Sequence, residues 1–153
     1  MPISHQHPNL KNKHYQAELE NKKQERKTMI YQGNCHCGAV KFEVEATDEV
    51  EVENCNCSIC NMTGFLHLIV PQRNFRIISG EENLTTYTFN TGVAKHKFCK
   101  TCGIKSFYIP RSNPDGVDVN LRCLSPQPKT VKIINFDGQN WEQHAHTITH
   151  KSL

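Results

Sequence analysis

Seven of the eight cysteines in this 153-residue chain fall into three closely spaced groups. The groups are a pair, a triple and a second pair: Cys35 and Cys37; Cys55, Cys57 and Cys60; Cys99 and Cys102. Such spacing places the sulfurs of each group on one side of a tight turn, the arrangement that a soft tetrahedral cation requires. The pattern therefore predicts bound zinc, and the alternatives are redox dithiols or ordinary buried thiols.

The pairs and the triple differ in the number of ligands that they offer. Gly38 follows Cys37 and Gly103 follows Cys102, and glycine takes at little cost the positive φ that turns the backbone toward a bound sulfur. The two pairs are thus expected to act as zinc knuckles that together supply four thiolates to a closed, structural site. The triple supplies three ligands, which leaves a fourth position for water or substrate. Zinc with three thiolates has a net charge of −1, which favours an incoming thiol over hydrolytic hydroxide.

The rest of the chain has the pattern of β-strands. Apolar residues alternate with polar ones, or β-branched and aromatic residues cluster, over residues 40–46, 50–53, 65–70, 75–78, 84–89, 93–98, 104–109, 117–123 and 131–136. Glycine, asparagine, aspartate and proline separate these segments. About nine short strands with tight turns predict an all-β fold, with one short helix over residues 140–147.

Charge divides the chain into a tail and a body. The formal net charge is +3, and it resides in the first 28 residues, which leaves the other 125 residues neutral. We expect a disordered or helical tail over 1–28, the zinc-binding domain over 29–145 and a short C-terminal tail over 146–153. The polar end of the chain is expected to be frayed and contains three histidines, His144, His146 and His150. A neutral body argues against nucleic-acid binding through the body, and weak contact by the basic tail stays open.

The sequence also indicates in which cellular compartment the protein is found. The longest apolar stretch, residues 65–70, is interrupted by a histidine and is too short to span a membrane. The N-terminus lacks the apolar core of a signal peptide. Eight cysteines in such a chain favour metal chemistry in a reducing compartment, so an intracellular location, cytoplasmic or nuclear, is expected.

Two histidines near the cysteine groups are candidates for catalysis. His67 lies in an apolar stretch seven residues after the triple, and His96 lies three residues before Cys99. Either ring could act as a general base, and His67 could instead be a fourth zinc ligand. The alternative for both is an ordinary hydrogen-bonded residue of the core.

Three polar residues are candidates for substrate binding. Asn120 and Arg122 share one face of an alternating strand, and the planar guanidinium of arginine matches a carboxylate. Arg122 is also a candidate for catalysis, and Arg111, in a proline-flanked turn, has the same carboxylate-binding chemistry. For all three the alternative is a solvated surface. Cys123, on the apolar face of the same strand, is expected to be a small buried residue, with a place near the open zinc as the alternative.

Four segments that contain the cysteines resemble one known family. Residues 33–40, 55–60, 96–103 and 120–124 are similar to the glutathione-dependent formaldehyde-activating enzymes. Residues 85–91 and 106–114 make the likeness closest to centromere protein V and its relatives. The resemblance covers about residues 30–143, nearly the whole body.

The resemblance implies a β-tent fold, in which curved antiparallel sheets are joined by zinc knuckles. It implies two zinc ions per chain, a structural one on Cys35, Cys37, Cys99 and Cys102 and one that binds glutathione on Cys55, Cys57 and Cys60. It implies a carbon–sulfur lyase reaction, the reversible addition of the glutathione thiol to formaldehyde or another small aldehyde. The alternative is a non-catalytic, zinc-stabilised interaction module, for example on chromatin.

Overall fold

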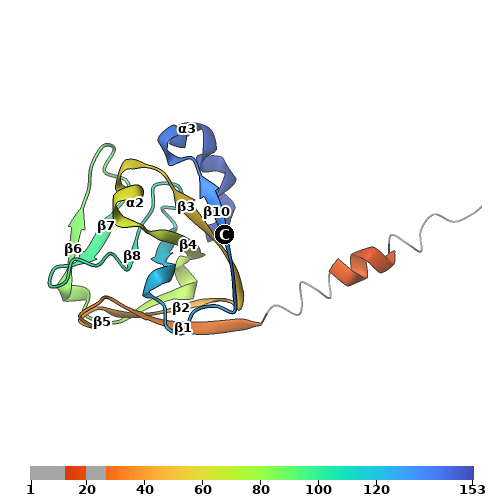
Figure 1. Cartoon of the computed structure of the whole chain (residues 1–153), viewed down its shortest axis with the longest axis horizontal. Helices are drawn as coiled ribbons and strands as arrows, with labels where there is room; N and C mark the ends of the chain where they lie inside the picture. Colours follow the sequence, from red (N-terminus) through yellow and green to blue (C-terminus); the bar gives the residue numbers. More distant parts are fainter. Residues whose placement is uncertain (1–12, 20–26) are drawn as a thin grey trace, which may run out of the picture.

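The computed structural model describes residues 13–19 and 27–153 of the chain. Residues 13–19 are helical and exposed to solvent. The rest of the predicted tail before residue 27, namely residues 1–12 and 20–26, lies outside the described residues (Figure 1). No helix within 13–19 or 27–153 has the length and hydrophobicity that crossing a bilayer requires.

Strands dominate the body, which confirms the prediction of an all-β fold. In chain order they are β1 (Thr28–Asn34), β2 (Lys41–Thr47), β3 (Glu49–Cys55), β4 (Leu66–Pro71), β5 (Phe75–Ser79), β6 (Leu84–Tyr87), β7 (His96–Cys99), β8 (Phe107–Tyr108), β9 (Gly116–Asn120) and β10 (Thr130–Phe136). Two short helices, α2 (Ser58–Thr63) and α3 (Trp141–His144), follow β3 and β10. The strands form a three-stranded sheet in the order β1-β2-β5, a five-stranded sheet in the order β10-β3-β4-β9-β8, and the pair β6-β7.

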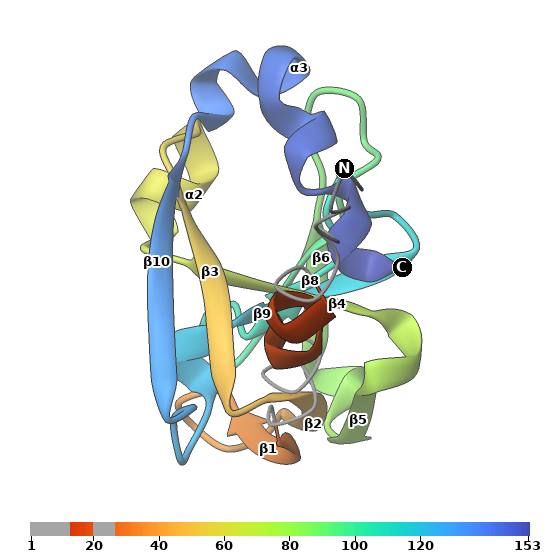
Figure 2. The same ribbon diagram turned by 90° about the vertical axis from the view of Figure 1, so that its right-hand side faces the viewer.

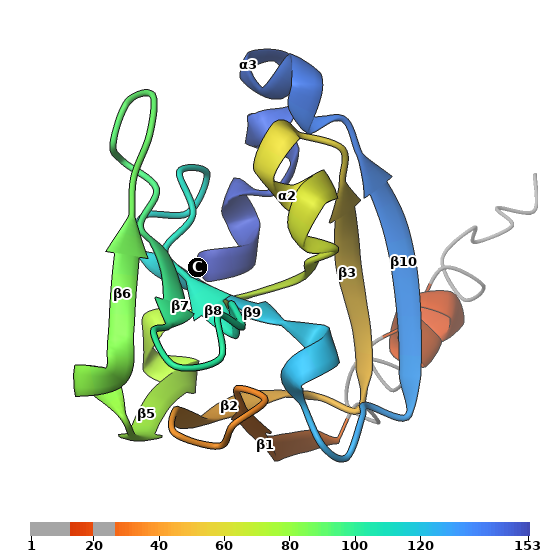
Figure 3. The same cartoon turned by 60° about the vertical axis from the view of Figure 1, so that its left-hand side comes forward.

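The sheets are arranged like the base and sides of a tent. In Figure 1 the β1-β2-β5 sheet forms the base, β3 and β10 rise on one side, and β6 and β7 rise on the other. Both α2 and α3 lie at the end opposite this base, as Figure 2 and Figure 3 show. Near the base, the rings of Phe42, Phe75 and Phe107 contact one another, with centroids 4.6 to 5.5 Å apart. This aromatic cluster joins the two larger sheets, since the three rings come from β2, β5 and β8.

One pairing departs from the antiparallel sheets that the family resemblance implies. β3 and β10 pair in parallel, with Val50 beside Val131 and Cys55 beside Phe136, whereas the other strand pairs are antiparallel. Parallel neighbours cannot be joined by a tight turn, and here most of the body separates them in sequence. The parallel pair brings the end of β10 to Cys55, so the C-terminal helices begin beside the cysteine triple.

The predicted strands over 84–89, 93–98 and 104–109 are shorter in the structure, and two further segments differ from the predicted strands. Residues 28–34 form a full strand, β1, in which Tyr31 is buried against β2, although the sequence indicated only that the body begins near here. Leu121–Cys123 is a 3-10 turn and not the end of a strand. The cause is Asn120, whose side-chain oxygen accepts a hydrogen bond from the Arg122 amide at 3.2 Å and so ends β9.

The C-terminal segment is ordered, and the prediction of a frayed polar terminus is wrong. After α3, residues Ala145–Thr147 and Thr149–Ser152 form 3-10 turns, and Ile148 and Ser152 are buried. The side-chain amide of Asn113 donates to Ile148 O, Thr149 O and Ser152 Oγ at 3.0 to 3.1 Å. These contacts attach the C-terminal turns to the loop before β9, and polarity alone could not indicate them.

We expect Asn113→Ala to lower the free energy of unfolding by about 1–3 kcal/mol, because it leaves buried acceptors without a donor. Urea unfolding followed by circular dichroism measures this change. Asn135→Ala, at an exposed position on β10, is the matched control and should cost less than about 0.5 kcal/mol. Equal stability of the two variants would show that the Asn113 contacts do not hold the C-terminal turns.

Candidate functional site

In the structure the two cysteine pairs meet in one cluster. The sulfurs of Cys35, Cys37, Cys99 and Cys102 all lie within 4.8 Å of one another. The chain turns back after each pair through a glycine of positive φ, 78° at Gly38 and 75° at Gly103. Cys35 and Cys99 are fully buried within the main core, so this cluster ties the turn after β1 to the end of β7 from inside the fold.

Backbone and side-chain amides point at the sulfurs of this four-cysteine cluster. The Val40 amide donates to Cys35 Sγ at 3.3 Å, and Asn83 Nδ2 donates to Cys99 Sγ at 3.1 Å. Donors of this kind stabilise thiolates over thiols. The cluster thus has the donor set and the supporting amides of a closed metal site.

The cysteine triple forms a second cluster where β3 ends and α2 begins. Cys55 is the last residue of β3, and Cys57 caps α2, its sulfur accepting from the Cys60 amide at 3.5 Å. All three sulfurs lie within 4.8 Å of one another, and no other described histidine, cysteine or acidic residue joins them. Gly138 passes directly over this three-cysteine cluster, where any side chain would overlap the Cys55 sulfur.

The chemistry of the three sulfurs favours a cation between them. Hydrogen bonds with Cys55 and Cys57, and then burial, raise the pKa of the Cys60 thiol, whereas hydrogen bonds with Cys55 and Cys60 lower the pKa of Cys57. Three thiolates so close together repel one another, and a soft divalent ion removes that repulsion while taking sulfur as its ligand. Both clusters fit such an ion, and each could bind one.

A cavity of about 420 Å³ opens beside the three-cysteine cluster. Its walls come from all five strands of the larger sheet, from β7, from α2 and α3, and from the loop between β6 and β7. The cavity brings together six of the residues that the sequence singled out: Cys55, Cys57, Cys60, His67, His96 and Arg111. Of the two clusters in the described part of the chain, the three-cysteine cluster lines this cavity and the four-cysteine cluster does not.

A row of buried polar side chains crosses the sheet on the cavity side. Neighbouring strands β3, β4, β9 and β8 contribute Glu53, His67, Asp118 and Tyr108, and all four residues line the cavity. His67 Nδ1 lies 2.6 Å from Asp118 Oδ2, and the Tyr108 hydroxyl lies 3.4 Å from the same nitrogen. Lys151, from the C-terminal turns, pairs with one oxygen of Glu53. Burial, and then the charge of Asp118, raise the pKa of Tyr108 well above its usual value, so the hydroxyl keeps its proton.

The second histidine, His96, lies in an environment that keeps it neutral. Its ring stacks on Tyr108, and its Nδ1 lies 2.8 Å from Nζ of the buried Lys105. Burial, and then the charge of Lys105, lower the pKa of His96 to about 4. The Lys105 ammonium lies 3.8 Å above the Tyr108 ring and 5.1 Å from the Phe65 ring. A neutral imidazole can accept a hydrogen bond from this ammonium.

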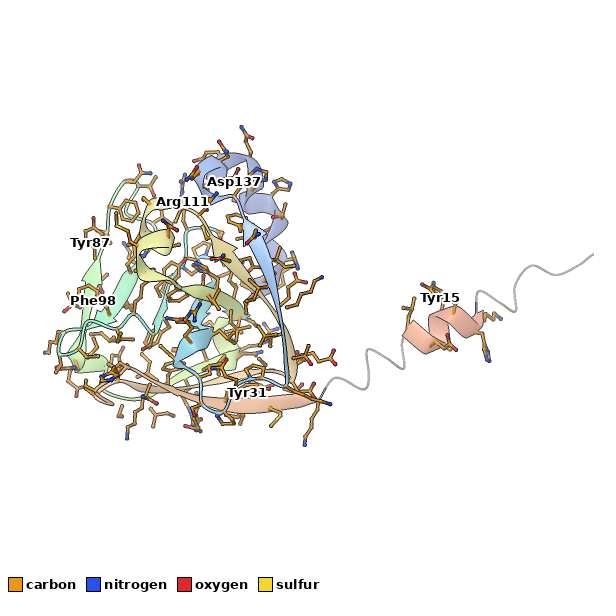
Figure 4. The ribbon with its side chains drawn as sticks, viewed as in Figure 1. Tyr15, Tyr31, Tyr87, Phe98, Arg111 and Asp137 are labelled. Atoms are coloured by element: carbon orange, nitrogen blue, oxygen red, sulfur yellow. The ribbon has the colours of Figure 1, made fainter. Side chains whose placement is uncertain are left out.

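Arg111 lies at the α2 and α3 end of the body, far from Tyr31 near the base (Figure 4). Its guanidinium carbon lies 3.9 Å from the centre of the Trp141 ring, and one guanidinium nitrogen lies 2.7 Å from Glu142 Oε1. Arg111 and Trp141 both line the cavity, whereas Glu142 is exposed. The ion pair with Glu142 shows that the Arg111 guanidinium is accessible to a carboxylate.

Asn120 and Arg122 do not line the cavity. The Asn120 amide donates to the backbone oxygen of Lys105 at 3.1 Å, and Arg122 Nε donates to Gly64 O, at the end of α2, at 3.2 Å. Both side chains therefore hold the backbone of segments next to the site in place. Cys123 is partly buried and packs against the main core, away from the three-cysteine cluster.

Sequence reasoning missed several cavity residues, of which Glu53, Asp118, Tyr108 and Trp141 are the clearest. Asp118 sat in a visible alternation, but that alternation equally describes a strand with one solvated face. In the structure every residue of β9 is buried, and the C-terminal turn Thr149–Ser152 packs on β4, the central strand beside it. The signal was therefore present, but the element that covers the polar face could not be foreseen.

Comparison with known proteins agrees with this geometry. The sequence pattern of the family described as glutathione-dependent formaldehyde-activating enzyme matches residues 30–140. The chain belongs to this family. The match contains both cysteine clusters and most of the cavity lining.

Two relatives of this family member are informative. A protein from Halomonas elongata named putative glutathione-dependent formaldehyde-activating enzyme is 29% identical over 82 residues, which cover 48% of this chain and 52% of that protein. The chain thus matches about half the length of that curated relative. The crystal structure of a Rhodobacter sphaeroides protein is similar with a TM-score of 0.60 and 39% identity, covering 67% of this chain and 99% of that one.

Proposed function

We propose that the chain catalyses the reversible addition of the glutathione thiol to formaldehyde or another small aldehyde, a carbon–sulfur lyase reaction. The observation that supports this most is the three-cysteine cluster, which lacks a fourth protein ligand among the described residues and faces the cavity. Zinc bound there would lower the pKa of an incoming thiol and hold it as a thiolate. Family membership supports the same substrates, a glutathione thiol and formaldehyde.

The four-cysteine cluster is proposed to bind a structural zinc ion, which makes two zinc ions per chain. Its four sulfurs complete a tetrahedral donor set without help from solvent. Its place in the main core, away from the cavity, suits a role in stability. The two ions would therefore have separate tasks, one in folding and one in substrate binding.

Within the cavity the chain's own residues orient the substrate. Arg111 is proposed to bind a glutathione carboxylate, exchanging the exposed Glu142 for it, because a guanidinium forms two parallel hydrogen bonds with such a group. Trp141 would keep the guanidinium in place by stacking. With carboxylate and thiol both held, the sulfur meets the small aldehyde in a fixed orientation, which is the main catalytic gain available here.

Calorimetric titration with reduced glutathione and with S-methylglutathione tests this function. We expect the S-methyl compound to bind the zinc-loaded protein at least about tenfold more weakly, since it cannot present a thiolate. Arg111→Gln should weaken binding of both compounds by a similar factor, because it removes only the carboxylate contact. Equal affinity of the wild type for the two compounds would mean that sulfur does not reach the three-cysteine cluster, and the proposed function would fail.

A further inference from the structure

The proposed reaction needs a proton carrier, because the thiol loses a proton and the aldehyde oxygen gains one. We infer that His67 is this carrier and that Asp118 holds its ring in position for both transfers. The inference rests on the proposed function and adds to it a catalytic residue that the cysteine clusters alone do not supply.

His67 lines the cavity, and a buried carboxylate holds its ring in place. The residue is 4% exposed, Asp118 is 1% exposed, and His67 Nδ1 lies 2.6 Å from Asp118 Oδ2. The other ring nitrogen, Nε2, is buried and has no hydrogen-bond partner among the described residues. An unpaired buried nitrogen costs about 1–3 kcal/mol unless a ligand or water meets it. Since His67 lines the cavity, a substrate bound there is a candidate partner for this nitrogen.

Asp118 decides which nitrogen of the ring carries the proton. A carboxylate can only accept hydrogen bonds, so Nδ1 donates to it, and Nε2 of the neutral ring is left with a lone pair. The Tyr108 hydroxyl, 3.4 Å from Nδ1, lies beside the same pair and keeps its own proton. The ring nitrogen left free to act as acid or base is therefore Nε2.

A different role for Nε2, as fourth ligand beside the three sulfurs, fits the structure less well. No nitrogen of His67 belongs to the group of donor atoms that lie within 4.8 Å of one another at the three-cysteine cluster. His67 also lies in the middle of the five-stranded sheet, paired with Glu53 and Asn120 on its two neighbours. Its backbone is thereby fixed, and it cannot approach the sulfurs without disrupting β4.

His67 alone can carry out both proton transfers of the reaction. Nε2 of His67 takes the proton from the glutathione S–H, and the sulfur electron pair forms the new bond to the aldehyde carbon. The π electrons of the C=O bond move to oxygen, and the imidazolium returns its proton to that oxygen. The products are S-(hydroxymethyl)glutathione and a neutral His67, and the reverse order of steps releases the aldehyde.

Exchange NMR with ¹³C-formaldehyde and glutathione tests the inference, with the spontaneous rate without protein subtracted. We expect His67→Asn to lower the protein-dependent exchange rate by about 10²-fold or more. Asparagine places an amide nitrogen near the position of Nδ1, which preserves the bond to Asp118 and removes only Nε2. Glutathione affinity in calorimetry should change by less than about threefold, and the zinc content should stay at about two ions per chain. His146→Asn, on an exposed turn outside the cavity, is the matched control and should keep the wild-type rate.

A second variant and an NMR spectrum of the wild type test the same inference if the His67→Asn protein does not fold. Asp118→Asn should also lower the rate by about 10²-fold, because an amide no longer fixes the tautomer of the ring. In ¹⁵N NMR of the zinc-loaded wild type, His67 should be protonated at Nδ1 and not at Nε2. An Nε2-protonated ring, or a His67→Asn protein as fast as the wild type, overturns the proton carrier alone. A wild type no faster than the solution without protein overturns the proposed function, and the proton carrier with it.

Discussion

Cys99→Ser is expected to unfold the body of the protein. Cys99 is fully buried in the main core, and its sulfur lies 3.7 Å from that of Cys37, 62 positions earlier in the chain. Structural zinc can contribute on the order of 10 kcal/mol to folding. The whole margin of a domain of this size is about 5–15 kcal/mol, so the loss of the ion leaves little or no net stability. Cys102→Ser should act in the same way.

Far-ultraviolet circular dichroism together with zinc counting measures this loss. Cys123→Ser is the matched control, since the eighth cysteine packs against the same core without belonging to either cluster. It should remain folded, keep its full zinc content and lose no more than about 1–2 kcal/mol. A Cys99→Ser protein that is as stable as the Cys123→Ser protein would show that the four-cysteine cluster does not hold the fold together.

The cysteine clusters could be predicted because they depend on local spacing. Two sulfurs two or three positions apart are close in almost any turn, and the positive φ of Gly38 and Gly103 was expected from their place after each pair. The strands were visible for a similar reason, since alternation with period two is a local property. The strands of the all-β body and the seven clustered cysteines therefore followed from the sequence.

Features that depend on contacts between distant segments did not follow from the sequence. The parallel pairing of β3 with β10 brings Phe136 beside Cys55, 81 positions apart in the chain, and no local pattern encodes it. The C-terminal turns bury Ser152 against Asn113 through hydrogen bonds, which composition does not reveal. As a result, the sequence alone leaves open whether the polar face of β9 binds substrate or is solvated, whereas in the structure Asp118 on that strand lines the cavity.

These distant contacts are also the ones that complete the site. β10 and α3 bring Gly138 and Trp141 to the cavity, and the C-terminal turns bring Lys151 to Glu53. The three-cysteine cluster alone would be an exposed loop of six residues. The rest of the fold adds a buried polar row on one side of it and a guanidinium at the rim, so that thiol and carboxylate can be bound together.

Cys57→Ser is expected to behave differently from Cys99→Ser and to remain folded. The cysteine triple spans six residues at the end of β3, so the metal closes only a short loop and little chain entropy depends on it. Cys57 belongs to the smaller core cluster around Phe136 and Ile148, not to the main core. We expect the variant to lose about 1–3 kcal/mol for the altered packing, since serine is itself a favourable N-cap residue. It should bind about one zinc ion where the wild type binds two, because serine is a poor ligand for a soft site.

Loss of glutathione binding should accompany this retained fold, since the proposed position of the thiol depends on the three sulfurs. Calorimetry with glutathione should show a decrease in affinity of at least about tenfold for Cys57→Ser, and Cys60→Ser should reproduce it. Circular dichroism and zinc counting on both variants separate loss of the site from loss of the fold. If both variants unfold as completely as Cys99→Ser, each cluster is structural, and the three-cysteine cluster loses its role as the place where a substrate sulfur binds. The variants could instead remain folded with about one zinc ion and still bind glutathione with wild-type affinity. In that case the thiol does not bind at the three-cysteine cluster, and the binding site has to be sought around Arg111.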